Sequence, residues 1–174
     1  GEEVKSRKKT NNKWFETQDA IAYYAEFAKP KIMYQKFQVK PCFVYDEQGL
    51  YCNDSMWIIP KEDKALLALL NSKMAWWLMK KKCTQIQNGV QLIWQYLSKI
   101  PVPRELPQQL ATLADEIIAA KSSLSLPKGT DNVIASESEA TQKQIADLEI
   151  QVNTLVYQLY GITDATEIEV VEKR

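Results

Sequence analysis

Histidine is absent from this 174-residue chain, and glycine and cysteine are scarce. Without histidine, the chain lacks the usual general base, the usual metal ligand and any Ser–His or Cys–His nucleophile pair. The five glycines are scattered and form neither a phosphate-binding loop nor a dinucleotide-binding fingerprint. Cys42, Cys52 and Cys83 follow no C-x-x-C pattern, which argues against a disulfide framework or a zinc site. We therefore expect no catalytic residues, metal site or cofactor within this chain.

Long hydrophobic runs are missing too. ALLALL at 65–70, one of the longest, is far shorter than the roughly 20 residues that a membrane-spanning helix needs. The charged stretch GEEVKSRKK has no apolar segment behind it and does not resemble a secretory signal. With 45% hydrophobic and 25% charged residues, the chain can bury a core, so we expect a folded, soluble, cytoplasmic protein.

Formal charge sums to zero but is divided unevenly along the chain. Residues 1–104 hold 17 Lys and Arg against 10 Asp and Glu, whereas residues 105–174 hold 5 against 12. Concentrated basic charge is typical of a surface that meets a polyanion, because each cation that neutralises a phosphate releases a counterion. Lysines that only keep a sheet edge soluble would give the same composition, so charge alone leaves both interpretations open.

The first half of the chain shows the pattern of β-strands. Residues 31–37 alternate between two faces with β-favouring types, bracketed by Pro30 and Pro41. Residues 42–52, CFVYDEQGLYC, predict a hairpin joined at DEQG, where Gly49 supplies the positive φ that closes such a turn. SMWIIP at 55–60 predicts another strand, which Pro60 ends.

The hydrophobic period then becomes helical. After Glu62 and Asp63, which suit a helix start, apolar residues recur at helical spacing and predict a helix that ends in KKK at 80–82. Cations suit the negative end of a helix dipole. These lysines are therefore explained either as a simple C-terminal charge cluster or as a group that contacts phosphate.

Beyond the proline-rich connector SKIPVPRELP, the chain is predicted to be all helical. Apolar residues spaced alternately by three and four run from Leu106 to Leu124 and from Ile145 to Ile162, which predicts an antiparallel pair of helices. We expect residues 125–139 to form the connecting loop, Gly161 to end the second helix and Thr163 to open a last short one.

The expected fold class is α+β. We expect a small mixed β-sheet recognition module with helices over residues 1–104, followed by an antiparallel helical hairpin within a C-terminal helical region over residues 105–174. The acidic balance of that second region would repel DNA, so we expect it to position the basic region rather than share its contacts.

Several stretches, in their order and spacing, resemble a known family. They are KPKIMY at 29–34, LNSK at 70–73, IPVP at 100–103 and LVYQLYGIT at 155–163. From about Trp14 to Glu172, the chain resembles the TaqI-like C-terminal specificity domain of type II restriction-modification enzymes. The resemblance implies a target recognition domain, which follows an adenine-specific DNA methyltransferase domain and often a nuclease domain. It implies sequence-specific DNA recognition without catalysis in this segment.

The hallmarks of the methyltransferase domain itself, an Asn-Pro-Pro-Tyr type tetrapeptide and a glycine-rich S-adenosylmethionine loop, do not occur in this sequence. The resemblance therefore implies a C-terminal fragment of a restriction endonuclease or adenine-specific methyltransferase, or a separate subunit of one. S-adenosylmethionine would belong to the parent enzyme. The implied partners are double-stranded DNA and the upstream methyltransferase or nuclease domains, or a partner subunit that carries them.

Lysines and amides are the candidates for DNA contact, because lysines fix the register on phosphates and Gln or Asn can pair with adenine edges. The candidates are Lys29, Lys31, Gln35, Lys36, Gln38, Lys40, Lys80, Lys81, Lys82, Gln85, Gln87 and Asn88. Each amide taken singly is more readily explained as an ordinary loop residue. Aromatic residues are expected in the core more than as stacking surfaces, namely Tyr23, Tyr24, Trp76, Trp77 and Trp94.

A second class of function stays open. The chain could be a protein–protein interaction or subunit-docking helical module without direct DNA readout, with the basic surface incidental. Loss of DNA binding alongside a defined oligomer would favour that alternative.

Overall fold

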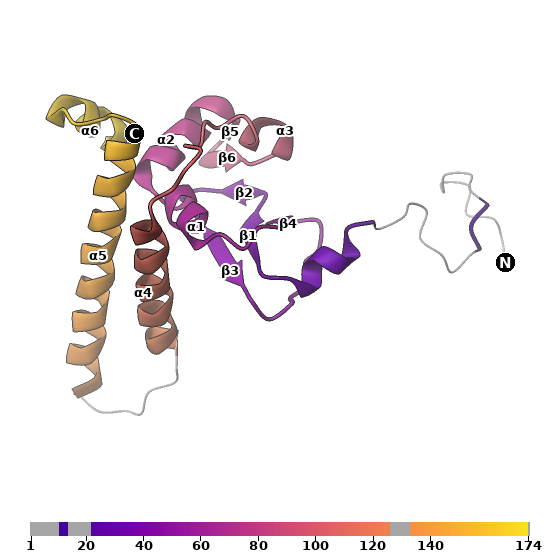
Figure 1. Cartoon of the computed structure of the whole chain (residues 1–174), viewed down its shortest axis with the longest axis horizontal. Helices are drawn as coiled ribbons and strands as arrows, with labels where there is room; N and C mark the ends of the chain where they lie inside the picture. Colours follow the sequence, from indigo (N-terminus) through magenta and orange to yellow (C-terminus); the bar gives the residue numbers. More distant parts are fainter. Residues whose placement is uncertain (1–10, 14–21, 126–132, 174) are drawn as a thin grey trace.

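The computed structural model describes residues 11–13, 22–125 and 133–173. In this part of the chain, two small antiparallel sheets lie beside a group of helices, and the long helices α4 and α5 stand side by side at one edge (Figure 1). The α+β class is confirmed, although the strands form two antiparallel three-stranded sheets rather than one mixed sheet. No helix within these described ranges is both long and apolar enough to cross a membrane.

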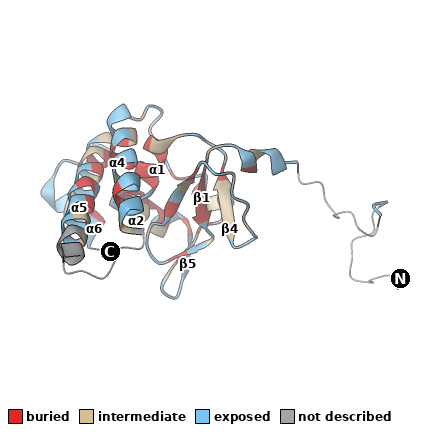
Figure 2. Ribbon diagram, turned by 90° about the horizontal axis from the view of Figure 1, so that it is seen from below, coloured by how far each residue is buried: buried red, intermediate tan, exposed pale blue. Residues whose placement is uncertain are grey.

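The larger sheet has the strand order β3-β1-β4, with β1 (Lys31–Gln35) between β3 (Phe43–Asp46) and β4 (Met56–Ile59). The first four residues of β1 are buried, on both faces of the sheet, while β4 is mostly half-buried (Figure 2). The strand predicted at 55–60 is thereby confirmed. The strand predicted at 31–37 is divided between β1 and β2.

The hairpin predicted at 42–52 is wrong, because β3 pairs with β1 and residues 47–52 form no strand. The reason is Asp46, whose carboxylate accepts the backbone N–H groups of Gln48 and Leu50 at 3.0 and 2.9 Å. These bonds draw the chain back onto Asp46 before a second strand can begin. Gly49 does have the predicted positive φ, at 74°.

The helix predicted to run through to Lys82 is two helices, α1 (Lys64–Leu70) and α2 (Lys73–Lys82). Ser72 separates them, with an extended ψ of 158°. Its hydroxyl donates to the Leu69 carbonyl at 2.6 Å and accepts the Ala75 N–H at 3.1 Å, so one side chain serves both helix ends. The hydrophobic period continues across this break, which explains why the pattern alone predicted one helix.

The C-terminal helices are α4 (Gln108–Ser125), α5 (Val133–Leu159) and α6 (Ala165–Glu172). Residues 133–139 of the predicted loop are helical, and residues 126–132 lie outside the described part of the chain. Gly161 ends α5 as predicted, with φ 71°, and the Ile162 N–H donates to the Tyr157 carbonyl at 2.9 Å. Asp164, rather than Thr163, caps α6.

One hydrophobic core joins α1 and α2 to the larger sheet on one side and to α4 and α5 on the other. All twelve apolar positions of the two predicted helical series are buried or half-buried, which confirms the packed antiparallel pair. Lys64 adds a polar link, because its ammonium lies 3.0 Å from the Glu47 carboxylate and 2.7 Å from that of Asp115 on α4. The core is therefore continuous across the predicted boundary between residues 104 and 105. The division of the chain into two regions at that boundary stays a prediction.

Candidate nucleic-acid interface

The second sheet is built from segments far apart in the sequence, β2 (Phe37–Gln38), β5 (Thr84–Ile86) and β6 (Gly89–Gln91), in the order β2-β6-β5. The chain passes from the larger sheet into this one at Lys36. The Lys36 N–H donates to the Ser55 carbonyl at 2.9 Å, and its carbonyl accepts the Leu92 N–H at 2.7 Å. These two bonds hold the sheets side by side.

Burial identifies the inner face of the small sheet. Residues directly opposite one another in an antiparallel pair point to the same face, and neighbours along a strand point to opposite faces. Gln38 and Val90 are opposite one another and are 4% and 0% exposed, so their face is the inner one. Gln85, on the edge strand β5, is opposite Val90 and therefore also points to the inner face. Its amide donates to the Lys80 carbonyl.

The outer face follows from the same pairing. Phe37, Gln91 and Thr84 are opposite one another across the three strands, and Ile86 lies two residues beyond Thr84 on the same face. Phe37 is 52% exposed and Ile86 is 37% exposed. The outer face thus presents apolar groups, a hydroxyl and an amide to solvent.

Gly89 and Gln38 fix the position of the β5–β6 hairpin against β2. A Cβ at Gly89 would lie closer than 3.0 Å to the Gln38 carbonyl oxygen, so only glycine allows this approach. The Gln38 side chain accepts the Cys42 N–H at 2.9 Å and donates to the carbonyls of Gln35 and Cys42 at 3.2 Å. Its amide closes the turn after β2, and the exposed tip of the hairpin, Gln87 and Asn88, is held beside that turn.

The lysines at 80–82 form the last turn of α2, as predicted, and only Cys83 separates them from β5. Lys81 and Lys82 are exposed, and the Lys81 ammonium lies 5.5 Å from the centre of the Trp77 ring. Lys80 is half-buried, and burial, with a smaller effect of the Lys81 charge, lowers its pKa. Lys81 and Lys82 are therefore the better placed of the three to meet an anion.

No acidic residue occurs in the two sequence segments that build this region, 27–45 and 64–104. Together they contain eleven Lys and Arg residues. Every formal charge carried by the small sheet, the turn after β2, α2 and α3 (Trp94–Leu97) is therefore positive. Such a surface attracts polyanions and repels basic proteins.

Six predicted contact residues are brought together around the small sheet. They are Lys36, Lys40, Lys81, Lys82, Gln87 and Asn88. Gln35, at the end of β1, is exposed and lies one residue before this group. Lys29 lies beyond the other end of β1, where its ammonium is 2.7 Å from the Glu26 carboxylate, and it does not belong to the group.

The structure corrects two predicted contacts. Lys31 is fully buried and pairs with Asp46 inside the protein, and the buried Gln38 side chain is hydrogen-bonded within the turn after β2, so neither can reach DNA. Gln85 is exposed and stays a prediction, although it is opposite the inward-facing Val90 and its amide donates to the Lys80 carbonyl at the end of α2. The alternation of 31–37 could not reveal these roles, because burial on both faces of β1 depends on segments distant in sequence.

The structure also exposes aromatic residues that were expected in the core. Trp94 is 52% exposed and lines a pocket together with Glu47, Glu62, Asp63 and Asp115, whereas Trp76 and Trp77 are half-buried. Phe37 and Val39 were not among the candidates, although an apolar residue between lysines, as in KFQVK at 36–40, is the signal that could have identified them.

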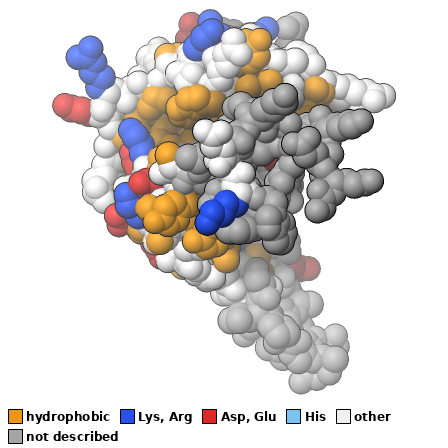
Figure 3. Space-filling view, turned by 90° about the vertical axis from the view of Figure 1, so that its right-hand side faces the viewer, with side chains coloured by type: hydrophobic (Ala, Val, Ile, Leu, Met, Phe, Trp, Pro, Cys, Tyr) orange, Lys and Arg blue, Asp and Glu red, His pale blue; other side chains and the backbone are white. Residues whose placement is uncertain are grey.

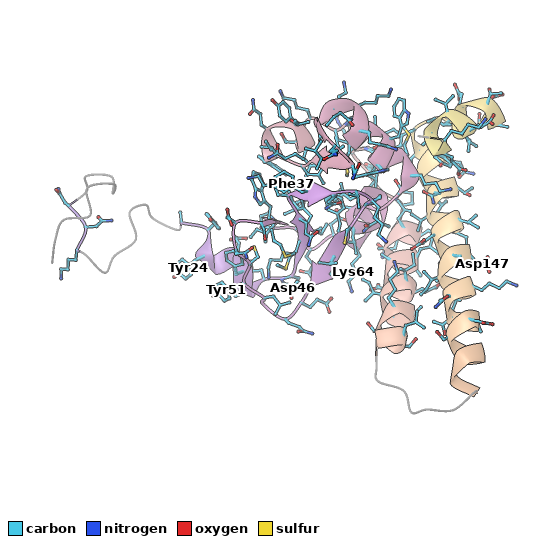
Figure 4. All side chains as sticks on the ribbon, turned by 180° about the vertical axis from the view of Figure 1, so that it is seen from behind. Tyr24, Phe37, Asp46, Tyr51, Lys64 and Asp147 are labelled. Carbon is cyan, nitrogen blue, oxygen red and sulfur yellow. The ribbon has the colours of Figure 1, made fainter. Side chains whose placement is uncertain are left out.

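A separate group of exposed apolar residues lies at the other end of β1, around η1 (Tyr24–Ala28). It consists of Tyr23, Tyr24, Leu50 and Tyr51, which are 53–72% exposed. The Tyr51 ring stacks on Phe27 at 4.9 Å between centres. Figure 3 shows hydrophobic side chains gathered on the side of the molecule where η1 lies, and Figure 4 shows Tyr24 and Tyr51 well apart from Phe37.

No curated protein matches this chain. The family of TaqI-like C-terminal specificity domains matches residues 2–102, which include both sheets, α1, α2 and α3 but not the helical hairpin. This match covers more than half of the chain and is shorter than the resemblance from Trp14 to Glu172. The chain belongs to the family of TaqI-like C-terminal specificity domains, which supports a DNA-recognition domain of a restriction-modification enzyme.

Proposed function

We propose that the outer face of the β2-β6-β5 sheet, with the last turn of α2, binds duplex DNA. Lys40, Lys81 and Lys82 contact phosphates and set the register of the protein on the duplex. Gln87 and Asn88, at the exposed tip of the hairpin, reach base edges, and their amides suit paired hydrogen bonds to adenine.

The observation that carries this proposal is an amide-rich hairpin within sequence segments that contain lysines and no acidic residue. Residues 84–91, TQIQNGVQ, contain four amide side chains and no charged one. A two-stranded β-ribbon fits the major groove, where each base pair presents its own pattern of donors and acceptors. The hairpin therefore brings sequence-reading groups, and the lysines around it bring groups that bind without regard to sequence.

We further propose that the chain serves an adenine-specific DNA methyltransferase or restriction endonuclease without itself carrying catalytic residues. The absence of histidine and of a methyltransferase tetrapeptide from the sequence supports this division of labour. The catalytic domains, with S-adenosylmethionine, would be supplied by an upstream part of the protein or by a partner subunit.

The test is the salt dependence of binding. The 174-residue chain should bind short duplexes of random sequence weakly, with affinity that falls steeply between about 50 and about 200 mM salt. Lys81→Ala combined with Lys82→Ala should weaken binding to all sequences similarly and reduce the slope of log affinity against log salt by about two. Fluorescence anisotropy with a labelled duplex measures both quantities.

Lys121→Ala combined with Lys143→Ala is the matched control, because these exposed lysines lie on α4 and α5, outside the proposed surface. It should leave affinity and slope unchanged. Affinity that does not respond to salt, or equal losses in both double variants, would refute the proposed surface.

A further inference from the structure

The apolar residues of the small sheet lie inside the proposed DNA-binding surface. Phe37 and Ile86 belong to its outer face, and Val39 follows β2 directly and is 68% exposed. Apolar side chains gathered on one exposed surface mark an interaction site when polar groups rim them. The groups around these three residues indicate the kind of partner.

Cations surround these apolar side chains. The Lys36 ammonium lies 5.8 Å from the centre of the Phe37 ring, and Lys40 directly follows Val39. Because the segments that form the surface contain no acid, charge complementarity favours an anionic occupant, and the family match favours DNA as that occupant. The major groove of DNA combines a polyanionic rim with one apolar group on the base edges, the methyl group of thymine.

An apolar group lies next to an amide on the outer face, as the thymine methyl group lies next to polar atoms on the major-groove edge of an A·T base pair. Gln91 is directly opposite Phe37 and therefore points to the same face. An amide can pair with the N6 and N7 atoms of adenine, while an adjacent apolar side chain contacts the methyl group of thymine. The pair Phe37 and Gln91 thus presents complementary groups for both bases.

From this juxtaposition we propose that Phe37, Val39 and Ile86 form a thymine-methyl-reading surface that contributes to sequence specificity. The inference rests on the proposed function, since it requires the small sheet to face DNA. It adds that part of the specificity is apolar and lies on β2 and β5, outside the amides at the hairpin tip.

Replacement of thymine by deoxyuridine removes the methyl group and leaves every hydrogen-bonding group in place. The 174-residue chain is first used to enrich sequences from a random duplex pool, and each thymine of an enriched duplex is then replaced in turn. At one or more positions we expect affinity to fall roughly fourfold, the effect of withdrawing one buried methyl from an apolar contact. In Phe37→Ser, Val39→Ser or Ile86→Ser, the loss at that position should disappear.

Val44→Ser is the matched control, because Val44 is an exposed apolar strand residue, 45% exposed, on β3 of the larger sheet. It should retain the full response to deoxyuridine. Thermal unfolding of each variant shows whether it is folded, and Ile86→Thr, which keeps a branched side chain, serves if Ile86→Ser is unstable.

The proposal is overturned if no sequence is enriched, if no replaced thymine lowers affinity, or if all three serine variants keep the full loss. A second pair of results would also overturn the proposal. In that case the chain binds no duplex and instead forms a defined oligomer, which the substitution Phe37→Ser dissociates. If only methyl reading fails, salt-dependent binding to duplex DNA persists. If the proposed function itself fails, that binding is lost as well.

Discussion

Lys31 and Asp46 form an ion pair inside the protein, with side chains 0% and 3% exposed. Both are further hydrogen-bonded, since the Lys31 ammonium donates to the Phe27 carbonyl at 2.7 Å and Asp46 accepts two backbone N–H groups. Burial acts to raise the pKa of Asp46, but the hydrogen bonds from Lys31, Gln48 and Leu50 outweigh it and lower the pKa. This one pair ties η1, β1 and the loop after β3 together.

Removal of Lys31 should therefore be costly. Lys31→Met leaves the Asp46 carboxylate buried without its partner, and we expect the free energy of unfolding in urea at neutral pH to fall by about 3–5 kcal/mol. Lys29→Met, which removes an exposed ion pair two residues earlier, should change it by less than about 1 kcal/mol. Similar losses in the two variants would show that the buried pair is not a stabilising centre.

The same pair predicts a pH dependence. Because the pKa of Asp46 is lower in the folded state than in the unfolded chain, its contribution is complete above the unfolded pKa of about 3.9 and is lost as pH falls below it. The free energy of unfolding should decline on acidification through this window. Asp46→Asn should be less stable at neutral pH, and its free energy of unfolding should fall less steeply on acidification. If the fall is as steep as in the unaltered protein, other carboxylates cause it.

At the scale of the element, the β5–β6 hairpin depends on one glycine. Gly89 lets the hairpin lie against the Gln38 carbonyl, and this contact sets where Gln87 and Asn88 stand relative to the lysines. Within the hairpin, β5 is exposed along its whole length, whereas Val90 on β6 belongs to the main core. A shift of β5 and of the tip therefore leaves most of that core in place.

Gly89→Ala should therefore affect recognition more than stability. We expect the unfolding free energy to fall by about 1–3 kcal/mol from overpacking, and sequence preference among duplexes to be lost while salt-dependent binding remains. Gly161→Ala is the control, since it places a side chain at positive φ at the end of α5 and costs about 1 kcal/mol away from the surface. Sequence preference retained in Gly89→Ala would contradict a positioning role.

At the scale of the whole molecule, the helical hairpin and the family domain share one core. The family match ends at residue 102, yet α4 packs against α1, and Lys64 is paired with Asp115 across that boundary. The acidic helices thus pack against α1 and α2 of the family domain.

A charge placed in this shared core should unfold both parts together. Val156→Asp, at a fully buried position on α5, should cost several kcal/mol, and Trp fluorescence and far-UV circular dichroism should report a single transition. Ile150→Asp, on the same helix but 62% exposed, should change stability little. If Val156→Asp melts only the helices and leaves a folded sheet region, the boundary near residue 104 separates two domains.

Local features were determined by the sequence alone. The class of most elements, the positive φ at Gly49 and Gly161, the end of α2 at its lysines and the antiparallel helix pair all follow from periodicity and capping between near neighbours. The excess of basic residues among the first 104 was also evident from the sequence, because composition does not depend on which segments pack together.

Only the tertiary structure decided which of those basic and amide residues can act together. Lys31 became a core residue because β1 is covered on both faces, and the small sheet exists because residues 37–38 pair with a hairpin at 84–91. A strand pattern specifies the faces of a strand but not its neighbours, since its ladder bonds join residues that no local spacing relates. The surface proposed to read DNA is therefore a product of long-range pairing.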